Sequence, residues 1–581
     1  MASILLSIRG DNLEDLTSLC RDWQNTLQHG NVIYIYRGTG THKVYIGQKG
    51  NFLTRHQQHY SGEDRERFLE AGFNKVLVVT SRYFNRSALD DVESQLITYF
   101  AADRANARSS VVGYDNEIIN RNGGNAVNDY RDREKVELEV IYPLWLSLYG
   151  MEWVSSPTLD ELRINALVKY SPIKQLTSEQ VDLINEITEN PGRNYVINGD
   201  AGTGKTVLLT HLVANILKDR PNARIGVVVQ PNWEETGRKI FKVFGMNNSR
   251  LVLDSSTKLI GRGGHYDVIV VDESHKLSRR YGKQHPSFNM VYNIEAYREC
   301  NSHLEILQQM GDQIVLMYDV LQAIRPANVT RKMFQSLTEG YEKRFLKTQF
   351  RIQTPEGKDY TSDDYINGIK YLLYKDTGLL SSSLTNFNPN FSREVFKDKS
   401  DDAYFGYFTE QPIHKLTEWI NLDRDFHPEH VDRVLGGLVE PWKQSDGKNP
   451  NIMHWHEDDI HRRWNSTQEN WINSADDDAE DQIGSVFGVQ GIDLNKVGVL
   501  IGADLEVGED GKLRGNPDRF YNTNGTFTSD EMQNPDNRFE FTLFVLNIYY
   551  VLLTRGIDGI RLGFWHNDAF REYMEKTLDI D

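Results

Sequence analysis

Residues 194–217 read NYVINGDAGTGKTVLLTHLVANIL, and this stretch decides the fold of most of the chain. An apolar strand, NYVIN, leads into a glycine-rich turn, and a helical run, VLLTHLVANIL, follows the turn. The turn has the spacing of a phosphate-binding loop, in which glycines let backbone N–H groups approach phosphate and the next helix N-terminus adds partial positive charge. We expect its nucleotide-binding residues to be Gly199, Gly202, Thr203, Gly204, Lys205 and Thr206.

An acidic pair further along the chain supports this interpretation. The apolar run 266–271 ends in Asp272 and Glu273. In a nucleotide hydrolase, the first carboxylate can hold Mg²⁺ and the second can polarise the attacking water. Thr206 would be a second magnesium ligand, and Lys205 would reach the β- and γ-phosphates. The sequence therefore predicts ATP and Mg²⁺ as cofactors.

Apolar strands separated by helical-length segments surround the loop. This pattern is typical of a parallel sheet covered by helices on both faces. A second set of strands near the C-terminus predicts a second sheet, so the expected fold class is α/β with two parallel-sheet lobes. The predicted strands are 194–199, 225–230, 267–273 and 313–319 in the first set, and 497–505 and 548–554 in the second.

The order of five short motifs identifies a family resemblance. They are DESH (272–275), YDVLQ (318–322), QFR (349–351), VQG-I-D (489–493) and VLLTRG (551–556). In this order they resemble the motif series of superfamily-one helicases, and most of all the Schlafen-like ATPase branch, a bacterial domain of uncharacterised function. The resemblance covers roughly residues 171–570 and implies two RecA-like lobes with ATP between them.

The helicase resemblance also implies roles for single residues. Gln180 resembles the glutamine that recognises adenine, and Gln322 resembles the sensor of the γ-phosphate. Arg351 and Arg555 resemble the arginines that reach the phosphates from the second lobe. A guanidinium delivered on lobe closure would stabilise the charge that develops on the transferred phosphoryl group.

Residues 31–125 form a separate small α/β unit. Its pattern predicts strands at 31–36 and 43–48, a helix at 51–60, a strand at 75–80 and a helix at 86–105. Arg55 and His59 lie four residues apart on one face of the first helix, and Glu93 lies on the second. With Val32-Ile33-Tyr34, Tyr45-Ile46-Gly47 and INRNGG (119–124), the unit resembles the GIY-YIG endonuclease family.

This second resemblance implies a metal-dependent nuclease site. A carboxylate-bound metal, an arginine and one or two tyrosines are sufficient to hydrolyse a phosphodiester. Glu93 would bind Mg²⁺ or Mn²⁺, and Arg55 would stabilise the phosphate. Tyr34 and Tyr45 would position or deprotonate water. The family pattern further implies that His59 assists and Asn120 supports the site, while Val32 in place of the first glycine removes no catalytic side chain.

These motifs predict a domain order. The expected parts are an N-terminal extension (1–30), a GIY-YIG nuclease domain (31–125), a connecting segment (126–170), a first RecA-like lobe (171–350) and a second RecA-like lobe with insertions (351–581). The formal net charge is −18, yet residues 31–125 carry twelve Lys and Arg against ten Asp and Glu. Any surface that binds nucleic acid must therefore be local.

Several classes of protein are excluded or disfavoured. No apolar run approaches the roughly 20 residues that span a bilayer, and the opening sequence turns acidic, so we expect a cytoplasmic protein without a secretory signal. The two cysteines, Cys20 and Cys300, give neither a disulfide framework nor a zinc site. We interpret residues 454–461, HWHEDDIH, as a solvated acidic helix rather than a zinc centre.

The leading hypothesis is an ATP-dependent nuclease-helicase that translocates on or remodels DNA and cleaves it, in anti-phage defence or DNA repair. DNA is favoured over RNA as the partner, and a homo-oligomer or a partner protein of a defence system fits the same hypothesis. One alternative is a nucleotide-gated nuclease switch that does not unwind. RNA as the target and a nuclease fold used only for binding are the others.

Overall fold

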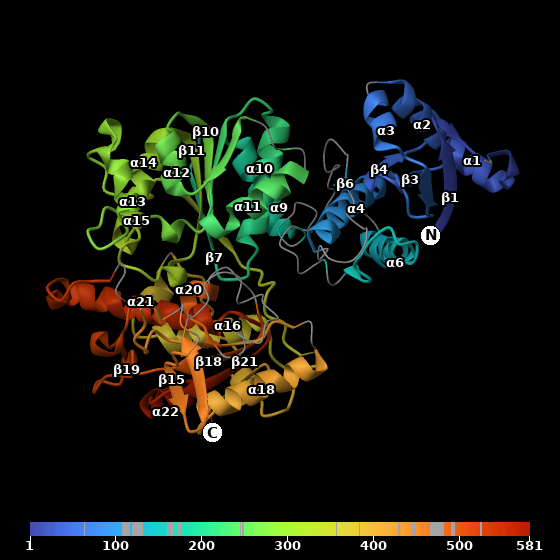
Figure 1. The fold of residues 1–581 in the computed structure, drawn as a ribbon. Helices are drawn as coiled ribbons and strands as arrows, with labels where there is room; N and C mark the ends of the chain where they lie inside the picture. Colours follow the sequence, from blue (N-terminus) through green and yellow to red (C-terminus); the bar gives the residue numbers. More distant parts are fainter. Residues whose placement is uncertain are drawn as a thin grey trace. The chain divides into compact units, whose positions relative to one another are not determined.

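A computed structural model gives the fold of the chain (Figure 1). It describes residues 1–580 except for 15, 63, 107–116, 119–129, 131, 160–161, 163–167, 169, 171–175, 244–245, 247–248, 356, 383, 428–429, 444, 447–448, 450, 465–481, 490–493 and 523–525. The chain divides into two compact units. The first comprises Met1–Pro191 and Thr206–Ser255, and the second comprises Gly192–Lys205 and Ser256–Asp581.

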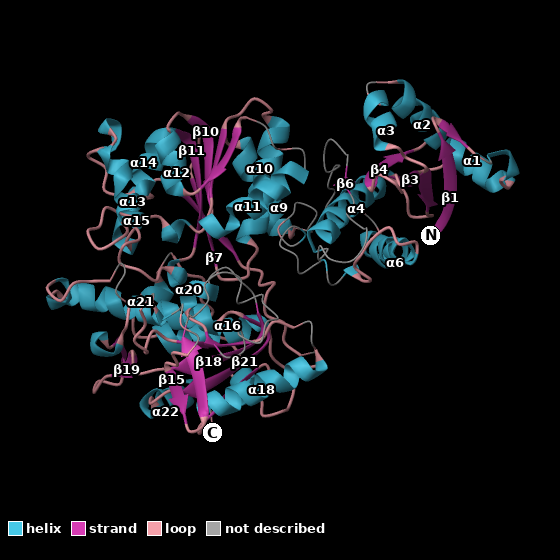
Figure 2. Ribbon diagram, viewed as in Figure 1, coloured by secondary structure: helices cyan, strands magenta, loops and turns pink. Residues whose placement is uncertain are grey.

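The first unit contains a mixed sheet with the strand order β2-β1-β5-β3-β4-β6 (Figure 2). Its central strand β3 pairs antiparallel with both β4 and β5. The strands are β1 (Ala2–Arg9), β2 (Asn12–Leu13), β3 (Val32–Arg37), β4 (Lys43–Lys49), β5 (Lys75–Thr80) and β6 (Glu117–Ile118). The helices around it are α1 (Arg21–His29), α2 (Phe52–Ser61), α3 (Arg65–Ala71), α4 (Arg86–Asn106), α5 (Arg133–Val136) and α6 (Tyr142–Gly150).

Both faces of this sheet are buried, because the side chains of β3 alternate between two cores. Ile33 and Ile35 pack into a core with residues of α4 and α6, and Tyr34 and Tyr36 pack into a core with residues of α2 and α3. The predicted order of strands and helices in residues 31–125 is confirmed. The short helix α3 was not predicted.

The N-terminal extension predicted for residues 1–30 is instead part of the sheet. β1 pairs antiparallel with β5 from Ala2, opposite Thr80, to Ser7, opposite Lys75. Residues 1–30 therefore supply a strand that completes the hydrogen bonding of β5. The sequence prediction missed this pairing because the partner strand lies some 70 residues away along the chain.

The segment predicted to connect the domains packs on its N-terminal neighbour. Trp145 of α6 is buried against Phe100 of α4, with ring centroids 5.5 Å apart, and its indole N–H donates to the carbonyl of Ser156. Ile240 of α11 (Glu234–Val243) lies in the same core. Residues 206–255, which we predicted as part of the first lobe, therefore group with the N-terminal unit. The other elements of this unit are α9 (Ser178–Glu189), α10 (Lys205–Asp219), β8 (Ile225–Val228) and β9 (Leu251–Asp254).

The second unit contains two parallel sheets, which confirms the predicted fold class. In the first, β7 lies between β12 and β11, and β10 follows β11. In the second, the order is β13-β21-β18-β14. The strands of the first are β7 (Tyr195–Gly199), β10 (Tyr266–Val271), β11 (Gly311–Tyr318) and β12 (Glu342–Leu346), and those of the second are β13 (Phe405–Phe408), β14 (Arg433–Gly436), β18 (Leu494–Ile501) and β21 (Gly556–Phe564).

Helices and small strands complete the second unit. The helices are α12 (Ser256–Arg262), α13 (Pro286–Asn289), α14 (His303–Met310), α15 (Arg331–Leu337), α16 (Ser362–Tyr374), α17 (Glu394–Lys397), α18 (Pro412–Phe426), α20 (Val486–Val489), α21 (Pro535–Leu553) and α22 (Asp568–Leu578). The small strands are β15 (Trp455–Glu457), β16 (Ile460–Trp464), β17 (Gln482–Ile483), β19 (Leu505–Val507) and β20 (Leu513–Gly515). Among the helices in the described part of the chain, none is long and apolar enough to cross a membrane.

The strand predicted at 548–554 is wrong. Helix α21 continues to Leu553, and the strand follows at Gly556–Phe564. All but one of the residues from Phe541 to Leu553 are buried. A helix that is apolar on all sides shows no 3.6-residue period, so its sequence cannot be distinguished from that of a buried strand.

The helix predicted at 454–461 is also wrong. Trp455 and Arg462 face each other in an antiparallel hairpin of β15 and β16. Trp455 is fully buried, and it packs edge-on against Trp464 with ring centroids 5.4 Å apart. The two tryptophans fix the hairpin by burial, and most of the polar residues between them occupy the turn or partly exposed positions, whereas Arg463 is buried.

Gly47 provides a test of the packing in the N-terminal sheet. A Cβ atom at this position would lie 2.6 Å from ring atoms of Tyr34 on the neighbouring strand. We expect Gly47→Ala to displace this ring and lower the free energy of unfolding by about 1–3 kcal/mol. Gly40→Ala, where nothing lies within 4 Å, is the matched control. Urea denaturation of both variants measures the difference, and equal stabilities would contradict this account of the packing.

Candidate functional site

The phosphate-binding loop adopts the geometry that its sequence predicts. β7 ends at Gly199 and α10 begins at Lys205, while Gly202 and Gly204 have φ angles of +86° and +78° that favour glycine. The hydroxyl of Thr203 donates to the carbonyl of Asp200 over 2.9 Å. The buried ammonium group of Lys205 donates to the carbonyls of Gly199, at 2.5 Å, and Asp200, at 3.0 Å. Thr206 is the second residue of α10.

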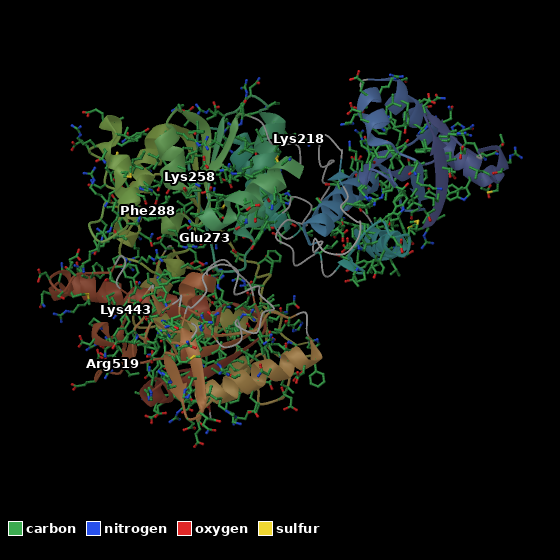
Figure 3. All side chains as sticks on the ribbon, viewed as in Figure 1. Lys218, Lys258, Glu273, Phe288, Lys443 and Arg519 are labelled. Atoms are coloured by element: carbon green, nitrogen blue, oxygen red, sulfur yellow. The ribbon has the colours of Figure 1, made fainter. Side chains whose placement is uncertain are left out.

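The acidic pair follows β10, where Glu273 is labelled in Figure 3. Glu273 has a φ of +49°, an unusual conformation for a residue with a side chain. Its Oε2 atom lies 2.9 Å from His275 Nε2 and 3.8 Å from Lys276 Nζ. Burial alone would raise the pKa of Glu273, but Lys276 and His275 outweigh it and hold that pKa well below its usual range. The backbone N–H of Glu273 donates to Asp272, which is itself buried.

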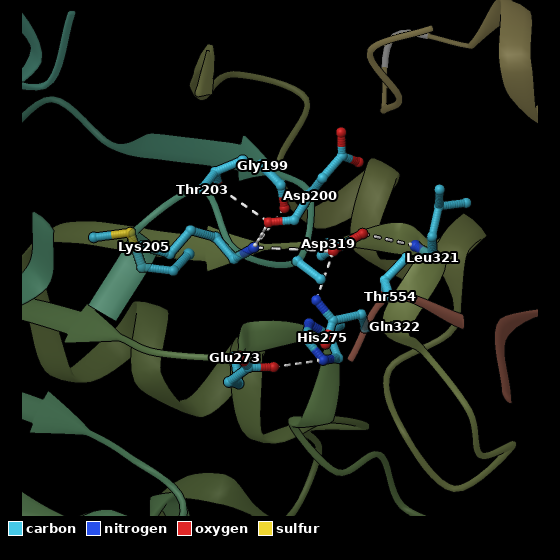
Figure 4. A network of polar contacts seen from close by, with 12 residues as sticks. Gly199, Asp200, Thr203, Lys205, Glu273, His275, Asp319, Leu321, Gln322 and Thr554 are labelled. Carbon is cyan, nitrogen blue, oxygen red and sulfur yellow. Dashed lines mark hydrogen bonds and ion pairs between the residues drawn. The ribbon is translucent and has the colours of Figure 1, made fainter. Parts of the chain in front are cut away.

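A chain of polar contacts joins the loop lysine to the arginine of the last motif, and Figure 4 shows its part from Lys205 through Asp319 to Gln322. Lys205 Nζ lies 3.9 Å from Asp319 Oδ2, and the amide of Gln322 donates to the same oxygen over 2.7 Å. The guanidinium of Arg555, which is 1% exposed, donates to Gln322 Oε1 over 3.3 Å. Three residues that were predicted separately are therefore linked through Asp319.

The QFR segment lies directly on the phosphate-binding loop. The side chain of Gln349 donates to the carbonyl of Ala201 over 2.6 Å, and the backbone N–H of Phe350 donates to the carbonyl of Gly202 over 3.0 Å. A Cβ atom on Gly202 would meet Gln349 Oε1 at 2.2 Å. The guanidinium of Arg351 donates to the carbonyl of Thr554 over 3.1 Å. Thr554 is the residue immediately before Arg555.

Two helices also hold the aspartate of the loop. Lys370 of α16 is 1% exposed, and its ammonium group donates to Asp200 Oδ2 over 2.6 Å. The hydroxyl of Tyr550 on α21 donates to Asp200 Oδ1 over 3.3 Å. One turn before Tyr550, Asn547 donates to the carbonyls of Val320 and Ala323, on either side of Gln322. Helix α21 therefore contacts both the phosphate-binding loop and the segment around Gln322.

Gln180 has a structural role of its own. It is the third residue of α9, and its side chain accepts from the backbone N–H of Thr177 over 3.1 Å in a capping box. Adenine recognition by Gln180 stays a prediction.

Sequence reasoning missed the partners Asp200, Asp319, Gln349, Lys370 and Tyr550. Asp319 and Gln349 lie within motifs that had been recognised, so their position beside assigned residues was an available signal. Lys370 and Tyr550 lie in ordinary helical sequence, 170 and 350 residues from Asp200. No local pattern could have identified them.

The residues of the second predicted site surround a cavity of about 680 Å³ in the first unit. Tyr34 and Tyr45 come from adjacent strands, Arg55 from α2 and Glu93 from α4. The other residues that line the cavity are Asn31, Gln48, Lys49, Gly50, Arg86 and Leu89. Four of the six residues that the sequence predicted for this site therefore share one cavity, and Asn120 lies outside the described residues.

His59 lies behind the tyrosines. It is fully buried, with Nε2 3.2 Å from the hydroxyl of Tyr34 and Nδ1 3.6 Å from Asp64. Burial and the nearby Arg55 lower the pKa of His59 to about 3. A neutral imidazole at physiological pH can orient the Tyr34 hydroxyl but does not supply a proton from a charged form.

Electrostatics around Glu93 fit a divalent metal ion. Burial, followed by repulsion from Asp90, raises the pKa of Glu93 to about 8, and Arg55 offsets only part of this. The carboxylate form of Glu93 therefore needs additional positive charge near it. A bound Mg²⁺ or Mn²⁺ would supply that charge, with open coordination positions for water and phosphate.

Comparison with known proteins assigns most of the chain to a family. The sequence model of the Schlafen group 3 DNA/RNA helicase domain matches residues 192–565. The chain belongs to this helicase family. The helicase domain thus includes the phosphate-binding loop, the acidic pair and Arg555, in agreement with the resemblance seen in the sequence. The GIY-YIG resemblance concerns residues outside this match.

The relatives and solved structures described next share less than 25% of their residues with this chain. An uncharacterized Saccharomyces cerevisiae protein, YPL245W, is 24% identical over 425 residues, which cover 63% of this chain and 80% of that protein. Among solved structures, the DUF1998 helicase MrfA bound to DNA is 9% identical, with a TM-score of 0.30 and coverage of 72% of this chain and 53% of MrfA. The Pyrococcus furiosus Hef helicase domain is 11% identical, with a TM-score of 0.30 and coverage of 71% and 98%. This chain thus spans about half the length of MrfA.

The raised pKa of Glu93 predicts how stability depends on pH. Between its ordinary pKa of 4.5 and about 8, folded protein keeps a proton that the unfolded chain has lost, so the stability of metal-free protein falls as pH rises through this window. We expect Glu93→Gln to remove this part of the pH dependence, and Mg²⁺ or Mn²⁺ to stabilise wild type more at pH 8 than at pH 5.

Thermal unfolding from pH 5 to pH 8.5, in EDTA and in excess metal, measures both effects. Glu70→Gln, which changes an exposed glutamate of the same domain, is the control. If Glu93→Gln and wild type show the same pH profile in EDTA, the assignment of a protonated, half-buried carboxyl at this position is wrong.

Proposed function

We propose that this protein is an ATP-dependent enzyme whose helicase-family domain binds and remodels nucleic acid and whose N-terminal domain cleaves it by metal-dependent phosphodiester hydrolysis. The observation that carries the proposal is the buried chain from Lys205 through Asp319 and Gln322 to Arg555. It connects Lys205, which would bind phosphate, through the proposed γ-phosphate sensor Gln322 with Arg555, which would stabilise the transferred phosphoryl group. Family membership over residues 192–565 supports a nucleic-acid motor.

Each residue of the ATP site has a proposed role in hydrolysis. Lys205 releases its carbonyl partners and binds the β- and γ-phosphates, and Glu273 accepts a proton from the attacking water. The depressed pKa of Glu273 keeps this carboxylate ionised, and His275 fixes its orientation. Arg555 stabilises the charge on the transferred phosphoryl group. Magnesium held by Thr206 and Asp272 would neutralise phosphate charge.

The N-terminal cavity supports a proposed nuclease site. Arg55 would bind the scissile phosphate, and Tyr34 or Tyr45 would orient the attacking water, with His59 holding the Tyr34 hydroxyl. A divalent metal ion on Glu93 would lower the pKa of the attacking water and stabilise the leaving oxygen. Burial raises the pKa of both tyrosines, so each would act on water mainly as a neutral hydrogen-bonding group.

DNA is the proposed substrate, and anti-phage defence or DNA repair is the proposed setting. Both rest on the pairing of a nuclease domain with a helicase-family motor in one chain. RNA is the other substrate that the family description allows. A comparison of matched DNA and RNA substrates decides between them.

ATPase and cleavage assays on the purified full-length protein test the proposal. Wild type in Mg²⁺ should hydrolyse ATP faster when nucleic acid is present and should cut at least one of single-stranded, duplex, supercoiled or RNA substrates. Lys205→Ala should reduce ATP hydrolysis by at least about a hundredfold, and Glu93→Ala should abolish cleavage while ATP hydrolysis continues. Absence of cleavage by wild type on every substrate, with Mg²⁺ or Mn²⁺, would refute the nuclease half.

A second candidate function is a nucleotide-gated nuclease switch that does not unwind. The observation that favours it is that elements outside the phosphate-binding loop are attached to it, because Gln349 binds the carbonyl of Ala201 and Lys370 of α16 binds Asp200. We propose that phosphate binding changes these contacts and shifts α16 and α21. Slow ATP hydrolysis without strand displacement would favour this switch, and hydrolysis with strand displacement would favour the motor.

Tyr550→Phe tests whether the contacts at Asp200 oppose nucleotide binding. The substitution removes the hydrogen bond to Asp200 and keeps the buried ring. One hydrogen bond contributes about 0.5–1.5 kcal/mol, so we expect ATP to bind about two- to tenfold more tightly. Tyr549→Phe, on the same helix, loses contacts to Asp504 and Gly502 instead and is the matched control. Unchanged or weaker ATP binding by Tyr550→Phe in calorimetry would contradict this role.

A further inference from the structure

Three metal-ligating side chains meet in the second unit, away from the ATP-site contacts described above. Asp423 lies in the last turn of α18, Asp432 lies immediately before β14, and His430 lies between them. One ligand atom from each residue lies within 4.8 Å of the corresponding atoms of the other two. Neither the helicase motifs nor the predicted nuclease set includes these residues.

The carboxylate of Asp432 is the decisive feature of this cluster. The side chain is 1% exposed, and its Oδ1 atom accepts a hydrogen bond from the backbone N–H of Lys496 over 2.7 Å. Its Oδ2 atom is buried and receives no hydrogen bond from any residue that the structure describes. The neighbouring group is another carboxylate, Asp423, which cannot donate to it when both are ionised. A buried oxygen without a donor is costly unless a cation or a proton occupies the space beside it.

The two oxygens of Asp423 have different partners. Lys496 Nζ binds Asp423 Oδ1 over 2.6 Å. The other oxygen, Oδ2, lies 2.8 Å from His430 Nδ1. Two ligands of one metal ion at roughly 2.1 Å lie about 3 Å apart in octahedral geometry, so this spacing matches ligands that share an ion.

We propose that Asp423, His430 and Asp432 bind a divalent transition-metal ion. One imidazole nitrogen and two carboxylate oxygens form a mixed donor set that suits Zn²⁺ or Mn²⁺ better than Ca²⁺, which prefers oxygen alone. The hydrogen bonds from Lys496 hold both carboxylates in place from a third element, β18. The ion would tie the end of α18 to the start of β14, so its role is to stabilise the second sheet.

Metal content and thermal unfolding test this site in the full-length chain. The parent protein for this test carries Glu93→Ala, which removes the proposed metal ligand of the N-terminal cavity. Nucleotide is left out, so that no magnesium–nucleotide complex forms at the phosphate-binding loop. After EDTA treatment and desalting, the protein is titrated with Zn²⁺ alone or Mn²⁺ alone, and bound metal is measured by mass spectrometry. We expect about one equivalent of ion bound and an increase in melting temperature of at least about 4 °C.

Asp432→Asn, which keeps the shape of the side chain, should lose both the bound equivalent and the increase in melting temperature. If Asp432→Asn does not fold, His430→Ala is the second test variant, because His430 is more exposed than the two aspartates. It should lose the bound equivalent in the same way. Asp504→Asn is the matched control, because Asp504 is fully buried in the same unit but is bonded to Tyr549 rather than to this cluster. It should bind the ion like the parent protein.

Two results would overturn the proposal. The first is a parent protein that binds neither ion and gains no thermal stability from them, in which case His430 and Lys496 alone neutralise the carboxylates. The second is equal binding by the parent protein, Asp432→Asn and His430→Ala, which would place the ion elsewhere.

Discussion

The buried ammonium group of Lys205 is the constraint on which the helicase domain depends. A buried cation must be hydrogen-bonded and paired, because its desolvation otherwise costs several kcal/mol. In this structure the carbonyls of Gly199 and Asp200 and the carboxylate of Asp319 satisfy it. These same groups would release Lys205 when phosphate arrives. Binding of phosphate by Lys205 would therefore exchange these partners for phosphate oxygens.

Helix α21 and the residues that follow it contact several segments around Lys205. Tyr550 contacts Asp200 of the loop, Asn547 contacts the segment around Gln322, and Arg555 follows the end of the helix. A change at the phosphate-binding loop would therefore alter contacts of one helix, whose C-terminal part is buried. Because packed cores switch between discrete arrangements rather than deform smoothly, this connection suits either a motor or a switch.

The carboxylates of the two predicted sites have pKa values that are shifted in opposite directions. Glu273 in the proposed ATP site has cationic neighbours that keep it ionised, whereas Glu93 is half-buried near Asp90 and has its pKa raised to about 8. The low pKa keeps the first carboxylate ionised, as its proposed role beside the attacking water requires. The second would favour a metal ion, because the ion would replace the proton. The directions of the two pKa shifts thus separate a proposed base from a proposed metal ligand.

The sequence by itself determined the phosphate-binding loop, the parallel sheets and most of the N-terminal unit, because each rests on contiguous motifs or on strand periodicity. It could not determine that α21 is a helix, since a segment buried on all sides has no period. It also missed the pairing of β1 with β5 and the contacts of Lys370 and Tyr550 with Asp200. Those depend on which distant surfaces pack together, and only the tertiary structure decided them.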